Sequence, residues 1–181
     1  FLIGAVADEF INSTRGEIGT IATLELFSIS IVSIIISRNT HRINRRLVFI
    51  LAAIIVAVGH SLTIYAPDLN TVFIARIISG IGSGAIVATI MATIAKAQNA
   101  KMTFALLNSG VGAAGVLLSL VIPRIISIYG MDGAYFIHLV FSLLAFLFIL
   151  LISFEEDSAE EKITLKPYKG KLGWIAMFGV A

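Results

Sequence analysis

Long uninterrupted runs of apolar residues restrict the fold of this chain more than any other feature. They occupy 17–37, 47–65, 71–96, 102–129 and 134–154, with shorter runs at 1–10 and 174–181. About 20 apolar residues in a helix span the roughly 30 Å hydrocarbon core of a bilayer. Only helices and closed barrels satisfy every backbone polar group in lipid, and these runs lack the alternation of barrel strands. The sequence therefore predicts an all-α, polytopic bundle of transmembrane helices.

The composition supports a membrane environment and disfavours enzymatic chemistry. Hydrophobic residues make up 58% of the chain and charged residues only 13%, whereas soluble domains carry about a quarter charged residues. The chain has no cysteine and only three scattered histidines, which excludes disulfides and thiolate metal sites and makes a zinc site unexpected. We find no recognisable Ser/His/Asp set. We therefore expect no enzymatic activity, no metal and no cofactor.

Basic residues mark alternate connections between the predicted spans. The loop after the second span holds four, the loop after the fourth holds two, and the segment after the sixth holds four, together ten of the thirteen Lys and Arg residues. Because Lys and Arg accumulate in cytoplasmic loops, we expect these three connections to face the cytoplasm. The Arg42, Arg45 and Arg46 cluster lies in so short a loop that orientation in the membrane explains it better than nucleic-acid binding.

The same pattern predicts three regions along the chain. Residues 1–154 form an N-terminal transmembrane bundle of six helices, of which the first is expected to be truncated. Residues 155–171 are long, charged and polar, as in a cytoplasmic linker. Residues 172–181 are expected to begin a seventh helix. Both ends of the chain resemble pieces of longer spans.

Two ionisable residues lie inside apolar runs, Glu25 in the second span and Arg76 in the fourth. A charge at the centre of a membrane helix costs about 2.5–3.5 kcal/mol on insertion scales, so such residues face a partner or a water-filled cavity. Both spans are expected to run inward from outside, and the two residues lie at similar depths. We favour a functional role for Arg76 over snorkelling to the interface. For Glu25, a protonatable functional carboxylate and a structural hydrogen bond are equally well supported.

Small and polar residues inside the spans indicate close packing. Gly80 and Gly84 form a G-x-x-x-G pair that lets helices approach, and Gly82 lies between them. A second set, Gly110, Gly112 and Gly115, matches a dinucleotide fingerprint by letter only, because that fingerprint needs a preceding strand; we predict packing there too.

Three further polar residues inside the spans have two interpretations each. Asn108 is a candidate for the substrate pathway, although an interhelical hydrogen bond is the simpler role. The histidines at 60 and 138 could relay protons, but a single interhelical bond is favoured for each.

In two of its segments the chain resembles the major facilitator superfamily. The segment 76–84, RIISGIGSG, is similar to the helix-4 motif R-x-x-x-G-x-G of that family, and 37–46, SRNTHRINRR, is similar to its helix 2–3 motif G-x-x-x-D-R-x-G-R-R. Arg42, Arg45 and Arg46 match the second motif, while Ser37, His41 and Asn44 depart from it. Six helices followed by a charged linker also resemble the half-molecule layout of the family.

The resemblance implies the N-terminal six-helix half of a 12-helix transporter that works by alternating access. Arg76 would then line the substrate cavity and take part in proton coupling, and Arg42, Arg45 and Arg46 would belong to a cytoplasmic gating loop. The expected partners are a small organic solute, protons, the lipid bilayer and the C-terminal half of the same transporter. We expect a multi-pass protein of the cell membrane, of the bacterial inner-membrane type. The alternative is a non-transporting sensor or assembly protein on the same scaffold.

Overall fold

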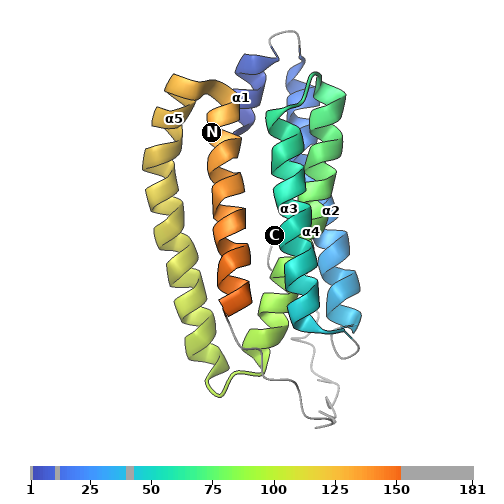
Figure 1. Cartoon of the computed structure of the whole chain (residues 1–181), viewed down its shortest axis with the longest axis vertical. Coiled ribbons are helices and arrows are strands. Elements are labelled where there is room, and N and C mark those ends of the chain that lie inside the picture. Colours follow the sequence, from blue (N-terminus) through green and yellow to red (C-terminus); the bar gives the residue numbers. More distant parts are fainter. Residues whose placement is uncertain (1, 11–12, 40–42, 152–181) are drawn as a thin grey trace, which may run out of the picture.

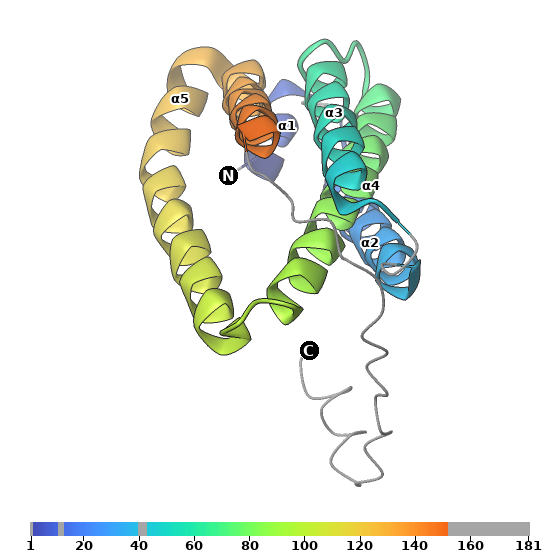
Figure 2. The same cartoon turned by 60° about the horizontal axis from the view of Figure 1, so that its bottom comes forward.

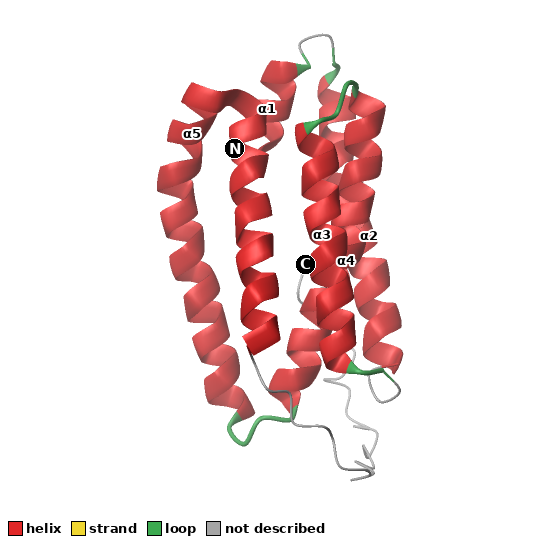
Figure 3. Ribbon diagram, viewed as in Figure 1, coloured by secondary structure: helices red, strands yellow, loops and turns green. Residues whose placement is uncertain are grey.

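The computed structural model describes residues 2–10, 13–39 and 43–151, and every regular element in this part of the chain is a helix (Figures 1 and 3). The helices are α1 (Leu2–Glu9), α2 (Arg15–Asn39), α3 (Arg45–Ile64), α4 (Leu69–Ala95) and α5 (Ala100–Leu151). All but α1 are long and apolar enough to cross a membrane. The predicted linker and the predicted seventh helix lie outside the described residues.

The predicted count of six helices is not confirmed, because the fifth and sixth predicted spans follow one another without a loop, as two arms of the element α5. Within α5 two helical arms meet at a kink at Gly130, whose φ of 62° and ψ of −150° are not helical and reverse the chain. A residue without a side chain adopts this backbone conformation at little cost. The two arms of α5, 100–129 and 131–151, consequently run side by side in opposite directions (Figures 1 and 2).

Polar capping residues explain why four helices begin two residues before the apolar runs. The predicted starts at 17, 47, 71 and 102 become 15, 45, 69 and 100. Asn44 accepts from the Leu47 amide at 3.0 Å, and Asp68 accepts from the Thr71 amide at 2.7 Å. An N-cap side chain satisfies an amide of the first turn that would otherwise have no partner. The polar first turn belongs to the helix, although hydropathy does not include it.

Glycines bring α4 into backbone contact with α2. A Cβ atom added at Gly80 would lie 2.6 Å from the Glu25 carbonyl oxygen, and one added at Gly84 would lie 2.5 Å from the Ile29 carbonyl oxygen. The Ser33 hydroxyl also donates to the Gly84 carbonyl at 3.0 Å. The predicted G-x-x-x-G pair thus lies where α2 and α4 meet.

The other side of α4 contacts α3 in the same way. A Cβ atom added at Gly82 would lie 2.7 Å from the Ala52 carbonyl oxygen, and one at Gly59 of α3 would lie 2.7 Å from the Ser79 backbone. With glycines on both sides, α4 packs closely between α2 and α3 (Figure 1). The residues of α4 that are buried include Val72, Arg76 and Ser79.

The glycines in the first arm of α5 do not contact another helix among the described residues. An added Cβ atom at Gly110, Gly112 or Gly115 would meet no described atom within 4 Å, and the arm lies at the edge of the molecule (Figure 2). The predicted packing role of these three glycines therefore has no partner helix among the described residues.

The outer face of α3 is apolar and exposed. Its exposed residues recur at the helical period: Leu47, Leu51, Ile54, Val58 and Leu62. A soluble protein rarely exposes so continuous an apolar stripe, whereas in a bilayer this face contacts acyl chains.

Candidate functional site

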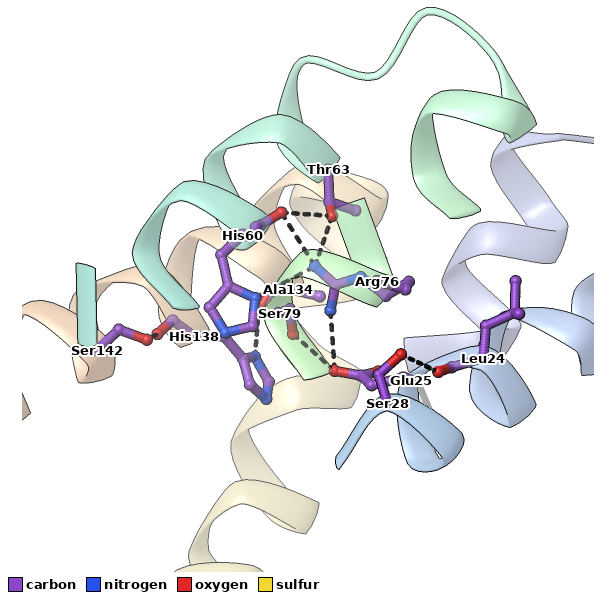
Figure 4. Close-up of polar contacts among 11 residues, drawn as sticks. Leu24, Glu25, Ser28, His60, Thr63, Arg76, Ser79, Ala134, His138 and Ser142 are labelled. Atoms are coloured by element: carbon purple, nitrogen blue, oxygen red, sulfur yellow. Dashed lines mark hydrogen bonds and ion pairs between the residues drawn. The ribbon is translucent and has the colours of Figure 1, made fainter. Parts of the chain in front are cut away.

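Arg76 projects from α4 into the space between α2, α3 and the second arm of α5, and only 2% of its surface is exposed (Figure 4). A guanidinium stays charged in proteins and carries five N–H donors but no acceptor. Burial of such a group is tolerated only where acceptors and an opposite charge replace the lost water. The surroundings of Arg76 therefore define the candidate site.

The α3 helix supplies the acceptors for one end of the guanidinium. Nη2 of Arg76 donates to the Gly59 carbonyl at 3.2 Å and to the Thr63 hydroxyl, and it lies 3.4 Å from Nδ1 of His60. The Thr63 hydroxyl gives its own proton to the Gly59 carbonyl at 2.9 Å, so its oxygen is free to accept from Arg76. Because Nη2 can only donate, its contact with His60 is a hydrogen bond when Nδ1 carries no proton.

The α2 helix supplies the opposite charge. Nη1 of Arg76 lies 3.5 Å from Oε1 of Glu25, and the hydroxyl of Ser79 donates to the same oxygen at 2.8 Å. The other carboxylate oxygen, Oε2, makes no hydrogen bond to a described residue, and 29% of the Glu25 side chain is exposed. The ion pair is longer than the 2.7–2.9 Å typical of charge-assisted hydrogen bonds. One oxygen of Glu25 is therefore bound within the site, whereas the other belongs to a partly exposed side chain and has no hydrogen-bond partner among the described residues.

The second arm of α5 closes the site with aromatic rings. The guanidinium carbon of Arg76 lies 4.6 Å from the centre of the Tyr135 ring, within the range of a cation–π contact. The His138 ring centre lies 5.6 Å from that of His60. Nδ1 of His138 lies 2.9 Å from the Ala134 carbonyl, so it carries the proton there, because a carbonyl can only accept.

One donor of the buried guanidinium is left over. The two N–H bonds of Nη2 face the three acceptors of α3, and Nη1 faces Glu25, but Nε of Arg76 has no hydrogen-bond partner among the described residues. Buried donors without partners are rare in native proteins and point to water, an ion or a ligand. The buried guanidinium therefore still has a donor to offer to a polar group.

The structure brings together only part of the predicted pathway. Glu25 and Arg76 are in contact, but Asn108 lies exposed on the first arm of α5 and donates to the Phe104 carbonyl of its own helix at 2.9 Å. Arg45 and Arg46 begin α3, at the end of that helix opposite to His60 and Thr63. The predicted gating residue at position 42 lies outside the described residues.

The sequence patterns missed Thr63, Ser79 and Tyr135 as members of the site. Each stands three or four positions from another member, as Tyr135 does from His138 and Ser79 does from Arg76, so the pairs share a helix face. An interhelical bond was the favoured role of each histidine. His60 contacts Arg76 of another helix, whereas His138 bonds to the Ala134 carbonyl of its own helix. A spacing of three or four residues from Arg76, His60 or His138 was the sequence signal that could have identified these residues.

The departure of Asn44 from the glycine of the helix 2–3 motif has a structural explanation. Its side chain caps α3 through the Leu47 amide. Asparagine is among the best N-cap residues and exceeds glycine by a few tenths of a kcal/mol or more. This substitution therefore preserves the start of α3 and gives no sign of a changed function.

Comparison with known proteins places the chain in a family. A family model described as Major Facilitator Superfamily matches residues 1–179. Comparisons with curated proteins and with solved structures gave no match. The family match covers nearly the whole chain, and it agrees with the four apolar helices that are long enough to cross a membrane. This multi-pass membrane protein therefore belongs to the Major Facilitator Superfamily, a family of membrane transporters.

Proposed function

We propose that this protein is a secondary active transporter of a small organic solute, driven by a proton gradient through alternating access. The observation that carries the proposal is the state of Glu25. This carboxylate lies inside a membrane helix, pairs with Arg76 through one oxygen and belongs to a side chain that is 29% exposed. Intramembrane ionisable residues commonly mark ion pathways and proton relays. In this proposal Oε2 of Glu25 takes up the transported proton.

The contacts of Glu25 differ between its ionised and its protonated form. When Glu25 is ionised, Oε1 accepts from Ser79 at 2.8 Å and faces Arg76 at 3.5 Å. At an effective dielectric constant of about 20, the attraction across this ion pair is on the order of 5 kcal/mol, before the cost of desolvation. Protonation removes that attraction. Protonation therefore favours conformations in which Glu25 and Arg76 are apart.

Arg76 is the fixed partner in this mechanism, because α3 and Tyr135 hold it independently of Glu25. The solute path runs along α1, α2, α4 and the first arm of α5, while α3 and the second arm of α5 face lipid. The basic loops lie in the cytoplasm, which places the start of α4 and the site nearer the outer surface. A second six-helix half completes the pathway, in a membrane of the bacterial inner-membrane type.

The test uses the full-length protein in proteoliposomes, with an imposed pH gradient and a panel of radiolabelled solutes. We expect accumulation of at least one solute that a protonophore abolishes. Glu25→Gln retains solute exchange without a gradient but loses accumulation driven by the gradient. Glu17→Gln is the matched control, because Glu17 lies on the same helix in the first-turn hydrogen bonds with Thr14, which glutamine also makes.

Two results would overturn the proposal. The first is the absence of gradient-driven flux for every solute of the panel. The second is gradient-driven accumulation by Glu25→Gln equal to that of the wild type, which would remove Glu25 from the coupling mechanism.

A further inference from the structure

The charge balance of the site restricts what can accompany a proton. From α2 to α5 the described helices contain only three acidic residues, Glu17, Glu25 and Asp132. Only Glu25 contacts Arg76. The other titratable groups that face the guanidinium are His60 from α3 and Tyr135 from α5, with His138 beside them. None of these three carries a negative charge near neutral pH, so Glu25 is the sole counter-charge among the described residues.

Protonation of Glu25 therefore leaves a net positive charge in a buried place. Arg76 cannot lose its proton to compensate, and only 2% of its surface is exposed to solvent. An unpaired charge in a low-dielectric environment costs several kcal/mol. The protonated state becomes accessible only if another anion arrives when the proton does.

We propose that the transported solute is a small organic anion with a carboxylate group, which replaces Glu25 at Arg76. This inference rests on the proposed function, because it takes Glu25 as the proton site. One proton from the external water binds Oε2 of Glu25. The carboxylate of one solute molecule then replaces the Glu25 carboxylate beside Nη1 of Arg76. The site is neutral before and after the exchange. Proton and monoanion cross together, and the step moves no net charge.

The contacts of Arg76 indicate the side of the guanidinium on which the anion binds. Nη2 is held by three acceptors of α3, and the Tyr135 ring covers the guanidinium. Among the polar contacts of the guanidinium, the one with Glu25 is the longest, at 3.5 Å, and Glu25 is partly exposed. Nε also has a hydrogen to donate. The carboxylate therefore displaces Glu25 and leaves the α3 contacts in place.

Movement of Glu25 is confined to its side chain. The carbonyl oxygen of Glu25 lies where a Cβ atom of Gly80 would meet it at 2.6 Å, so the α2 backbone is packed directly on α4. The Glu25 carboxyl can rotate away from Nη1 while the backbone remains in contact. The exchange needs no separation of the two helices.

A binding experiment on the purified full-length protein in detergent tests the inference. The probes are acetate, lactate and benzoate, each compared with its uncharged amide, in weakly buffered solution with a pH indicator. We expect the carboxylates to bind and the amides not to bind. Binding should take up about one proton per carboxylate from solution, because the displaced Glu25 becomes protonated.

The Glu25→Gln variant provides the sharpest readout, because it changes one atom and keeps the shape of the side chain. We expect it to bind the same carboxylates without proton uptake, whereas the Glu17→Gln control behaves as the wild type. Arg76→Gln should lose carboxylate binding. The Glu25→Gln readout keeps the inference testable even if Arg76→Gln does not fold.

The outcomes separate this inference from the proposed function. Equal binding of carboxylates and amides, no binding of either, or undiminished proton uptake in Glu25→Gln would each overturn the anion inference. Gradient-driven accumulation of an uncharged solute would also overturn it, while supporting proton-coupled transport. The absence of all gradient-driven flux would overturn the proposed function itself.

Discussion

Gly80 of α4 has no room for a methyl group, and the atom that blocks it belongs to the candidate site. An added Cβ atom would lie 2.6 Å from the Glu25 carbonyl oxygen and 2.8 Å from Cβ of Ser28. Ordinary van der Waals contact begins near 3.4 Å, so α2 must move by about 0.8 Å to accept alanine. The substitution Gly80→Ala therefore tests both the helix packing and the ion pair.

The magnitude has three parts. Overpacking of this kind costs about 1–3 kcal/mol. Opening the Arg76–Glu25 distance of 3.5 Å by about 0.8 Å weakens the attraction by roughly 1 kcal/mol at an effective dielectric constant of about 20. Alanine regains about 1 kcal/mol of helix propensity over glycine. We expect Gly80→Ala to lower the free energy of unfolding by about 1–3 kcal/mol in total.

Denaturant titration of the purified full-length protein in detergent measures this change. Gly84→Ala should also destabilise, because its Cβ atom would lie 2.5 Å from the Ile29 carbonyl oxygen. Gly110→Ala is the matched control, since its Cβ atom would meet no atom of a described residue within 4 Å, and it should be neutral or mildly stabilising.

A double-mutant cycle isolates the ion-pair part. In a Glu25→Gln background the attraction is already absent, so Gly80→Ala should cost about 1 kcal/mol less than in the wild type. Equal stability of Gly80→Ala and Gly110→Ala would refute the packing contact. The same cost of Gly80→Ala in both backgrounds would refute the link between this contact and the ion pair.

Three further substitutions test the surroundings of Arg76 and the helix starts. Thr63→Val keeps the shape of the side chain but removes an acceptor of Arg76, and it should cost about 1–3 kcal/mol in the same titration. Asn44→Ala removes a helix cap and should cost about 1 kcal/mol, whereas Asn44→Gly should cost only a few tenths; equal costs would show that the side chain does not cap. Hydrogen bonds from the Thr71 amide and side chain hold the pKa of Asp68 below its ordinary value. The stability that Asp68 contributes is therefore present above its ordinary pKa and is lost as pH falls through the lower, folded-state pKa; thermal melts of Asp68→Ala should approach the wild type in acid, and a constant difference at every pH would contradict this.

Hydropathy alone predicted the existence and approximate length of α2, α3 and α4. Its prediction is reliable because the requirement is local: in lipid each backbone amide must bond within its own segment, whatever the neighbours are. The two-residue error at each helix start has the same local origin. Residues such as Asp68 are polar, yet they satisfy the first amides of the helix.

Other features needed the tertiary structure. The similar depths of Glu25 and Arg76 in the membrane were consistent with a contact between them. The sequence did not show that His60 and Tyr135 belong to the same cluster. Helical periodicity assigns residues to a face but not to a partner, and these residues come from helices far apart in the chain. The rotation of each helix depends on packing against all the others.

The glycines show the same division between sequence and structure. Gly80 and Gly110 both lie in glycine-rich helical segments, and both were predicted to pack. Only Gly80 contacts another helix among the described residues, because α4 lies between α2 and α3 while the first arm of α5 lies at the edge. The sequence by itself determined that the chain crosses the membrane in helices, since transfer into lipid is a property of each segment. Which faces meet, and hence the site around Arg76, was decided only by the tertiary structure, because packing is shared among helices.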